Sequence, residues 1–182
     1  MRIRPMVPDD AAAVAAIYNH YVLDTVVTFE EEAVAAGEMA RRLGRVAVRY
    51  PWLVGEAEGE IVGYAYADLF KNRSAYRFTA ETTVYLRPDM TGKGNGRLLY
   101  AHLLSALEER GIVNAVAIIA LPNPASIRLH ERTGFRRAGR LLGGGRKFGR
   151  WLDVEYWQRA LGRPSGGGVA GGTDKFLCIL AR

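Results

Sequence analysis

The sequence lacks the features of secreted, membrane-spanning and disulfide-bonded proteins. It has one cysteine, Cys178, so an internal disulfide is excluded, which suits a reducing cytoplasm. No apolar run comes near the roughly 20 residues that a helix needs to cross a bilayer. The charged start, Met1 to Pro5, is followed by no apolar signal segment. We therefore expect a soluble, cytoplasmic protein that does not contact membranes.

Zinc-finger spacing and a basic helix are also absent, although the formal net charge is +6. The basic residues are scattered, with small clusters at Arg41-Arg42 and Arg136-Arg137. Such a surface attracts phosphate in general, so a polyanionic small molecule is as good a partner as a nucleic acid. We expect no nucleic-acid binding and no bound metal.

The length of 182 residues suits one domain with a substantial core. The composition changes after Gly162, where a glycine-rich segment begins that cannot bury enough apolar surface to fold. We predict a folded domain over residues 1–162 and a disordered tail over residues 163–182.

Hydrophobic periodicity and turn residues divide the folded part into short elements. Strands are predicted at 2–6, 52–57, 61–70, 79–86 and 114–121, and helices at 8–21, 34–50, 96–110 and 122–134. Residues 135–142 and 146–159 are predicted to form a terminal hairpin, with the glycine run 143–145 between them. The strand, helix, strand succession over 79–121 implies that its two strands pair in parallel.

A glycine-rich turn marks the centre of the chain. The apolar run Thr82 to Leu86 leads into Gly92-Lys93-Gly94-Asn95-Gly96, which opens a helix. Free backbone N–H groups and the helix dipole favour an anion such as phosphate there, and Lys93 and Arg97 add positive charge. The alternative is that the glycines only let the chain turn.

Three separated motifs carry a resemblance to a known family. They are Thr79-Ala80-Glu81-Thr82-Thr83-Val84-Tyr85, Leu121-Pro122-Asn123-Pro124-Ala125-Ser126-Ile127-Arg128-Leu129-His130 and Gly149-Arg150-Trp151-Leu152-Asp153-Val154. With the order of elements, over about residues 3–161, they resemble the GNAT superfamily of acyl-CoA-dependent N-acyltransferases, in its phosphinothricin and methionine sulfoximine N-acetyltransferase branch. The resemblance implies an α/β fold: a mixed, mostly antiparallel sheet with splayed parallel central strands and helices on both faces.

The resemblance also implies a site for acetyl-CoA, used as a cosubstrate. The pantetheine arm is expected along Val84, Tyr85 and Leu86, and the pyrophosphate on Gly92, Lys93, Gly94, Asn95, Gly96 and Arg97. Asn123 and Ser126 match further coenzyme contacts of the family. Thr91 stands where the family usually has Gln or Arg, so its short side chain cannot make the same long reach.

Glu81 and His130 match the family's proposed acid/base pair. Amines with a pKa well above neutrality arrive protonated, so transfer needs a base, and the departing thiolate benefits from an acid. The resemblance does not say which residue takes which role. Alternatively, Glu81 is an outward-facing solvated residue and His130 caps its short helix.

Arg73 and Tyr76 match positions that line the family's acceptor pocket, and Lys71 lies close by and is counted with them as a candidate substrate contact. A guanidinium can hold a carboxylate through two hydrogen bonds, but the basic linker 71–77 can also be a solvated crossover. Relatives form dimers in which the terminal hairpin shapes the site, so Lys147, Trp151 and Asp153 are candidates for an interface role. Their alternative role is packing within the hairpin.

The resemblance implies a homodimeric N-acetyltransferase that moves acetyl from acetyl-CoA directly to the α-amine of a small amino-acid-like acceptor. Phosphinothricin and methionine sulfoximine are the acceptors of that branch. The alternatives are a protein N-terminal or polyamine N-acetyltransferase, and a regulatory module that binds CoA without turnover.

Overall fold

The computed structural model describes residues 1–162, so the predicted tail and Cys178 lie outside the described residues. One seven-stranded sheet has the order β1-β2-β3-β4-β5-β7-β6. Its strands are β1 (Arg2–Pro5), β2 (Trp52–Ala57), β3 (Glu60–Leu69), β4 (Thr79–Leu86), β5 (Asn114–Ala120), β6 (Arg136–Lys147) and β7 (Arg150–Ala160). The α-helices are α1 (Ala11–Asp24), α2 (Ala36–Val46), α3 (Asn95–Glu109) and α4 (Pro124–Arg132).

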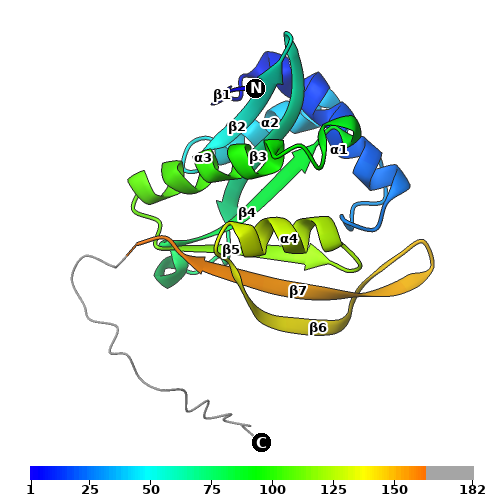
Figure 1. Ribbon diagram of the computed structural model, residues 1–182, viewed down its shortest axis with the longest axis vertical. Coiled ribbons are helices and arrows are strands. Elements are labelled where there is room, and N and C mark those ends of the chain that lie inside the picture. The colour runs from blue at the N-terminus through cyan, green and yellow to red at the C-terminus, as the bar shows by residue number, and fades with distance from the viewer. Residues whose placement is uncertain (163–182) are drawn as a thin grey trace, which may run out of the picture.

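The two central strands pair over a short length and then part. β4 and β5 are parallel and share three residue pairs, from Thr79↔Asn114 to Glu81↔Val116. All other neighbouring strands are antiparallel. Beyond Glu81 the strands diverge, as Figure 1 shows. The predicted mixed sheet with splayed parallel central strands is therefore confirmed.

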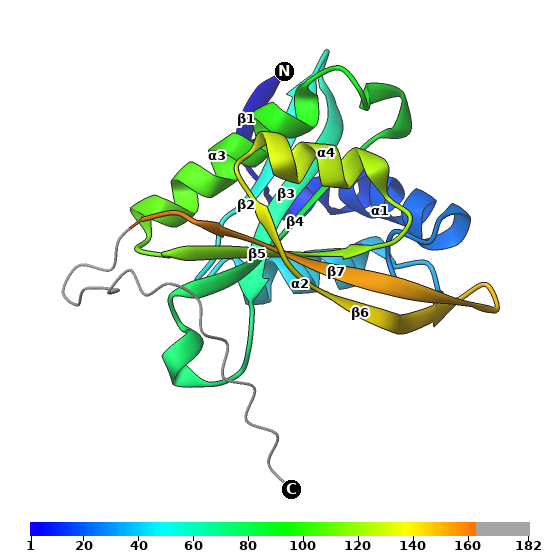
Figure 2. The same cartoon turned by 60° about the horizontal axis from the view of Figure 1, so that its bottom comes forward.

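Helices cover both faces of the sheet, with α1 and α2 on one face and α3 and α4 on the other (Figures 1 and 2). Helix α3 packs on the sheet through an apolar stripe: its leucines at 99, 103 and 107 recur on one side of the helix and are fully buried. Within residues 1–162, no helix combines the length and the apolar character needed to cross a membrane.

Strand β4 presents alternate side chains to these two helical layers. Thr82 bonds to Tyr100 of α3, and a Cβ added to Gly96 of α3 would lie 3.3 Å from the Leu86 side chain. Tyr85 instead packs against Tyr18 and Tyr21 of α1. The even-numbered residues 82 to 86 therefore face the α3 layer, and the odd-numbered residues 81 to 85 face the α1 layer.

The terminal hairpin turns at a different place from the one predicted. The turn lies at Phe148 and Gly149, which both have positive φ, and the run Gly143-Gly144-Gly145 lies inside β6. The pairing register shifts between Leu141 and Gly145, so the run forms an irregular stretch of strand. Helix α2 is also shorter than predicted, because it begins at Ala36 and ends at Val46.

Candidate active site

A cavity of about 630 Å³ lies where β4 and β5 part. Because β4 alternates between the two helical layers, the cavity has two differently lined sides. The α3 side is lined by Thr82, Leu86, Gly92, Gly94, Gly96, Arg97, Asn123, Ser126, Arg128, Leu129, His130 and Arg132. The α1 side is lined by Tyr18, Tyr21, Val27, Thr28, Phe29, Tyr66, Glu81, Thr83 and Tyr85. The opening between β4 and β5 connects the two sides through the sheet.

The glycine turn on the α3 side has the geometry of an anion site. Gly92 and Gly94 have φ values of +72° and +85°, a conformation that favours glycine, and no other group lies within 4 Å of the Cβ position of either residue. No side chain caps the start of α3 at Gly94, so the first N–H groups of the helix are available. Arg97 lines the cavity from the first turn of the helix. This donor set fits a pyrophosphate.

Lys93 and Asn95 of the same turn do not line the cavity. The Asn95 side-chain amide donates to the Met90 carbonyl at 3.1 Å, so it fixes the shape of the turn. Thr91 lines the cavity, and its hydroxyl donates to the Pro88 carbonyl at 2.8 Å. The shape of the turn therefore depends on these internal bonds.

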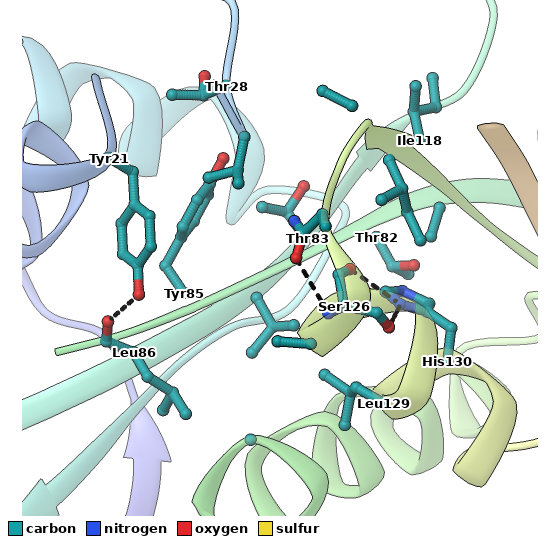
Figure 3. A pocket seen from close by; sticks show the side chains of 18 of the residues that line it. Tyr21, Thr28, Thr82, Thr83, Tyr85, Leu86, Ile118, Ser126, Leu129 and His130 are labelled. Carbon is teal, nitrogen blue, oxygen red and sulfur yellow. Dashed lines mark hydrogen bonds between the residues drawn. The ribbon is translucent and has the colours of Figure 1, made fainter. Parts of the chain in front are cut away.

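The edge of β4 that faces β5 has no strand partner beyond Glu81 within the described residues. Val84, Tyr85 and Leu86, the predicted pantetheine contacts, all line the cavity. The Leu86 carbonyl accepts a hydrogen bond from the Tyr21 hydroxyl at 2.6 Å (Figure 3). This bond ties α1 to the end of the strand.

Helix α4 begins with Asn123, whose side-chain oxygen accepts from the Ser126 N–H at 3.1 Å. Pro124 occupies the first turn, where a missing N–H costs nothing. This cap sets the orientation of α4, which presents both Ser126 and His130 to the cavity (Figure 3). The predicted residues Asn123, Ser126 and His130 are thus brought together by one helix, with Asn123 at its N-cap and His130 in its last turn.

His130 is buried, and its two ring nitrogens are both bonded within the protein. Nδ1 lies 2.8 Å from the Ser126 carbonyl oxygen and 3.2 Å from the Ser126 hydroxyl. A carbonyl only accepts, so Nδ1 carries the proton, and Nε2 accepts from the Tyr100 hydroxyl at 3.1 Å. Burial lowers the pKa of His130, which favours this neutral ring.

Tyr100 and Thr82 extend the His130 network, and sequence reasoning missed both. Tyr100 is completely buried, and its hydroxyl lies 2.6 Å from the Thr82 hydroxyl. Burial raises the pKa of Tyr100, so it keeps its proton. In the sequence, Tyr100 looks like another apolar member of the α3 stripe, and only the packing of α3 against α4 brings its hydroxyl to His130.

Glu81 lies on the opposite side of the cavity from His130. Burial raises the pKa of Glu81, and the negative charge of Asp68 adds to the rise. Asp68 is the residue directly opposite Glu81 on β3. The positive charge of Lys71 acts against the rise in pKa. Glu81 is therefore a half-buried carboxyl that titrates at a higher pH than an ordinary one.

Lys71, Arg73 and Tyr76 do not line the cavity. They are exposed in the loop between β3 and β4, which contains the short 3-10 helix η2 (Ser74–Tyr76). The α1 side is instead lined by four tyrosines, at positions 18, 21, 66 and 85, of which sequence reasoning had placed only Tyr85 at a binding site. Tyr18 and Tyr21 stand three residues apart on α1, a spacing that indicated a packed face without indicating its partner.

The three hairpin candidates occupy different environments. Trp151 is 72% exposed, whereas Lys147 is completely buried. Asp153 accepts from the Gly143 N–H at 2.8 Å and pairs with Arg140, and these bonds lower the pKa of Asp153. Asp153 therefore supports the irregular stretch of β6.

Comparisons with known proteins agree with the geometry. The family described as an acetyltransferase (GNAT) domain matches residues 3–156. The chain is 44% identical over 165 residues to a phosphinothricin N-acetyltransferase of Streptomyces viridochromogenes, covering 91% of this chain and 90% of the relative. It is 38% identical over 162 residues to an L-methionine sulfoximine/L-methionine sulfone acetyltransferase of Salmonella typhimurium, covering 88% of this chain and 95% of that relative.

A solved structure shows the same fold. The GNAT superfamily phosphinothricin acetyltransferase of Sinorhizobium meliloti, in complex with AcCoA, matches with a TM-score of 0.87 at 38% identity, covering 93% of this chain and 95% of that chain. The resemblance expected from the sequence motifs is confirmed, and the chain belongs to the GNAT superfamily of N-acetyltransferases.

Proposed function

We propose that the enzyme transfers acetyl from acetyl-CoA directly to the α-amine of a small amino-acid-like acceptor, such as phosphinothricin or methionine sulfoximine. The observation that carries this proposal is one cavity that passes through the sheet, with an anion site on one side and a half-buried carboxyl on the other. Relatives named for these two acceptors, and a neighbour solved with AcCoA, support it.

The α3 side is the proposed coenzyme side. The free edge of β4 suits the pantetheine arm, and the turn from Gly92 to Arg97 suits the pyrophosphate. When bound, acetyl-CoA supplies an activated thioester carbonyl. The acceptor then occupies the α1 side, because the opening between β4 and β5 is where the two substrates can meet.

Glu81 is the proposed base, since it lines the acceptor side. It takes one proton from the ammonium group, and the amine nitrogen forms a bond to the carbonyl carbon. The bond from carbon to sulfur then breaks, and the leaving thiolate takes the second proton that the nitrogen loses, which gives the amide and free CoA. A raised pKa suits this role, because a base works best when its pKa is near the working pH. Lys71 acts on this carboxyl through its charge, which supports a place for Lys71 near the acceptor. Arg73 and Tyr76 lie in the same loop and are proposed to approach the acceptor with it.

His130 is proposed to act on the leaving sulfur through Ser126. The Nδ1–H group faces both acceptor atoms of Ser126, so the Ser126 hydroxyl proton is left to point into the cavity. There it can hydrogen-bond the negative charge that develops on sulfur. Tyr100 holds the other ring nitrogen and keeps the ring in this orientation.

A homodimer is also proposed. The β6–β7 hairpin projects from the body of the protein (Figure 2). It exposes Leu141, Leu142, Phe148 and Trp151 at 50%, 81%, 55% and 72%. Large apolar side chains gathered on one projecting element are typical of an interface.

The proposed reaction is tested by release of free CoA from acetyl-CoA, measured with a thiol reagent. The acceptor panel contains phosphinothricin, methionine sulfoximine, common amino acids, a polyamine and a short peptide. We expect release with the first two acceptors. Release with only the polyamine or the peptide would show a different acyltransferase, and acetyl-CoA binding without any release would show a regulatory module.

Glu81→Gln should lower kcat/KM by about 10²- to 10⁴-fold, as expected for a lost base. In the wild type, kcat/KM should fall as the pH drops through the raised pKa of Glu81, because the protonated carboxyl cannot accept a proton. Asp68→Asn removes the charge that helps to raise this pKa, so the same fall should move to lower pH. A pH profile that neither variant changes would remove Glu81 from the reaction.

His130→Ala should lower kcat by about 10²-fold or more while the Kd for acetyl-CoA changes by less than about twofold. Ser126→Ala should lower kcat to a similar degree, and the double variant should lose little more, because both act in one network. Additive losses in the double variant would contradict action through Ser126. Equal activity in His130→Ala would exclude His130 altogether.

Trp151→Lys should convert the proposed dimer to a monomer, since a charge in a desolvated apolar contact is costly. Sedimentation equilibrium checks this against the chain mass of 20.1 kDa. Arg150→Gln, a change at the neighbouring exposed position, is the control and should leave the mass unchanged. A wild-type mass equal to one chain would overturn the dimer.

A further inference from the structure

Lys147, at the end of β6, is a buried cation. Its side chain has no exposed surface, and within residues 1–162 it has no carboxylate at ion-pair distance. Its Nζ instead donates to the Thr28 carbonyl at 2.8 Å and lies 3.5 Å from the Tyr21 carbonyl. The Phe148 ring centroid is 5.0 Å away.

A buried ammonium is costly unless polar groups replace its water. Burial lowers the pKa of Lys147, which reflects this cost. The two carbonyls provide the compensation, and the Tyr21 carbonyl belongs to the last turn of α1, where the helix dipole is negative. A neutral side chain of similar length would fill the space without this cost. The role of the charged group should therefore lie in the residues that it contacts.

What Lys147 contacts is the loop over residues 25–35, between α1 and α2. Val27, Thr28 and Phe29 of this loop line the cavity on the α1 side. Thr28 offers its carbonyl to Lys147, and its hydroxyl lies 2.8 Å from that of Tyr18. The part of the loop that lines the cavity is therefore held from β6 as well as from α1.

Phe29 gives a second contact between the same two segments. A Cβ added to Gly145 would lie 2.3 Å from the Phe29 ring, so the ring occupies the space that any other residue at 145 would fill. The position of the Phe29 ring explains the presence of glycine there. Lys147 fixes the backbone at Thr28, and the absence of a side chain at Gly145 leaves room for the ring of Phe29.

The far end of the loop has its own attachment. Asn19 of α1 exchanges two hydrogen bonds with the Val34 backbone, at 2.9 Å and 2.8 Å. Glu30 binds Arg42 of α2 at 2.7 Å. These bonds hold residues 30–34 to α1 and α2. Lys147 reaches Glu30 and Glu31 only through the attraction of opposite charges, whereas its hydrogen bond and the packing at Gly145 act on Thr28 and Phe29.

We propose that Lys147 is a positioning residue for the acceptor: with Gly145, it holds Val27, Thr28 and Phe29 as the wall of the acceptor side. This inference rests on the proposed function. In this proposal the β6–β7 hairpin, which also carries the proposed dimer face, contributes to acceptor affinity. Lys147 makes its contribution within its own chain. The coenzyme side shares none of these contacts, so acetyl-CoA affinity does not depend on Lys147.

The test is a KM-against-kcat comparison on the full-length enzyme with the acceptor found in the thiol assay. Lys147→Met keeps the length of the side chain and removes the charge. We expect the acceptor KM to rise by about tenfold or more, with kcat within about threefold and the acetyl-CoA Kd within about twofold. Arg146→Gln, which removes a neighbouring exposed cation, should change none of them. An unchanged KM in Lys147→Met would overturn the proposal, even if the melting temperature falls.

Gly145→Ala provides a second variant in case Lys147→Met does not fold. Its new methyl group must displace the Phe29 ring, so it should also raise the acceptor KM with acetyl-CoA affinity unchanged. An unchanged KM in this variant would likewise count against the proposal.

Amide hydrogen exchange at residues 27–29 gives a readout that needs no acceptor. Exchange there should quicken in Lys147→Met and stay at the wild-type rate at Val34, which Asn19 holds. Unchanged exchange at 27–29 would overturn the anchoring. A wild-type enzyme without activity would instead count against the proposed function, so the two failures are distinguishable.

Discussion

The parting of β4 and β5 after three residue pairs is the constraint on which the site depends. Paired strands would fill the middle of the sheet with backbone hydrogen bonds and leave no passage between its faces. Once the strands part, the edge of β4 is free, and a cavity connects the two helical layers. The glycine turn and α4 then line one side of this cavity, and α1 with its following loop lines the other.

The alternation of side chains along β4 places different functional groups on the two sides of the cavity. Glu81 and Thr82 are neighbours in sequence, yet Glu81 faces the α1 side, the proposed acceptor side, and Thr82 bonds to the network of His130 on the α3 side, the proposed coenzyme side. The proposed base and the proposed group that stabilises the leaving sulfur can therefore approach one reacting carbonyl from opposite faces of the sheet. The proposed mechanism follows from this separation.

In two buried polar side chains, hydrogen bonds to protein groups replace the hydrogen bonds that water would make. His130 has both ring nitrogens bonded, and Lys147 has its ammonium on two backbone carbonyls. In each case the bonds restrict the group to one orientation, since breaking them would leave a buried polar atom unpaired. His130 fixes the Ser126 hydroxyl on the α3 side of the cavity, and Lys147 fixes the backbone of the loop at Thr28 on the α1 side.

Local patterns in the sequence determined the elements, because hydrophobic period and turn residues act over a few neighbours. They predicted β2 and β4 at their observed bounds, the glycine turn, and the motifs that carry the family. Only the tertiary structure decided that Tyr100 bonds His130, that tyrosines of α1, β3 and β4 form one wall, and that Lys147 meets Thr28. It also decided that the hairpin turns at Phe148 and Gly149, and that Gly145 inside β6 packs against Phe29, more than a hundred residues away in the chain. Contacts at such separation depend on the packing of whole elements, which no local pattern contains.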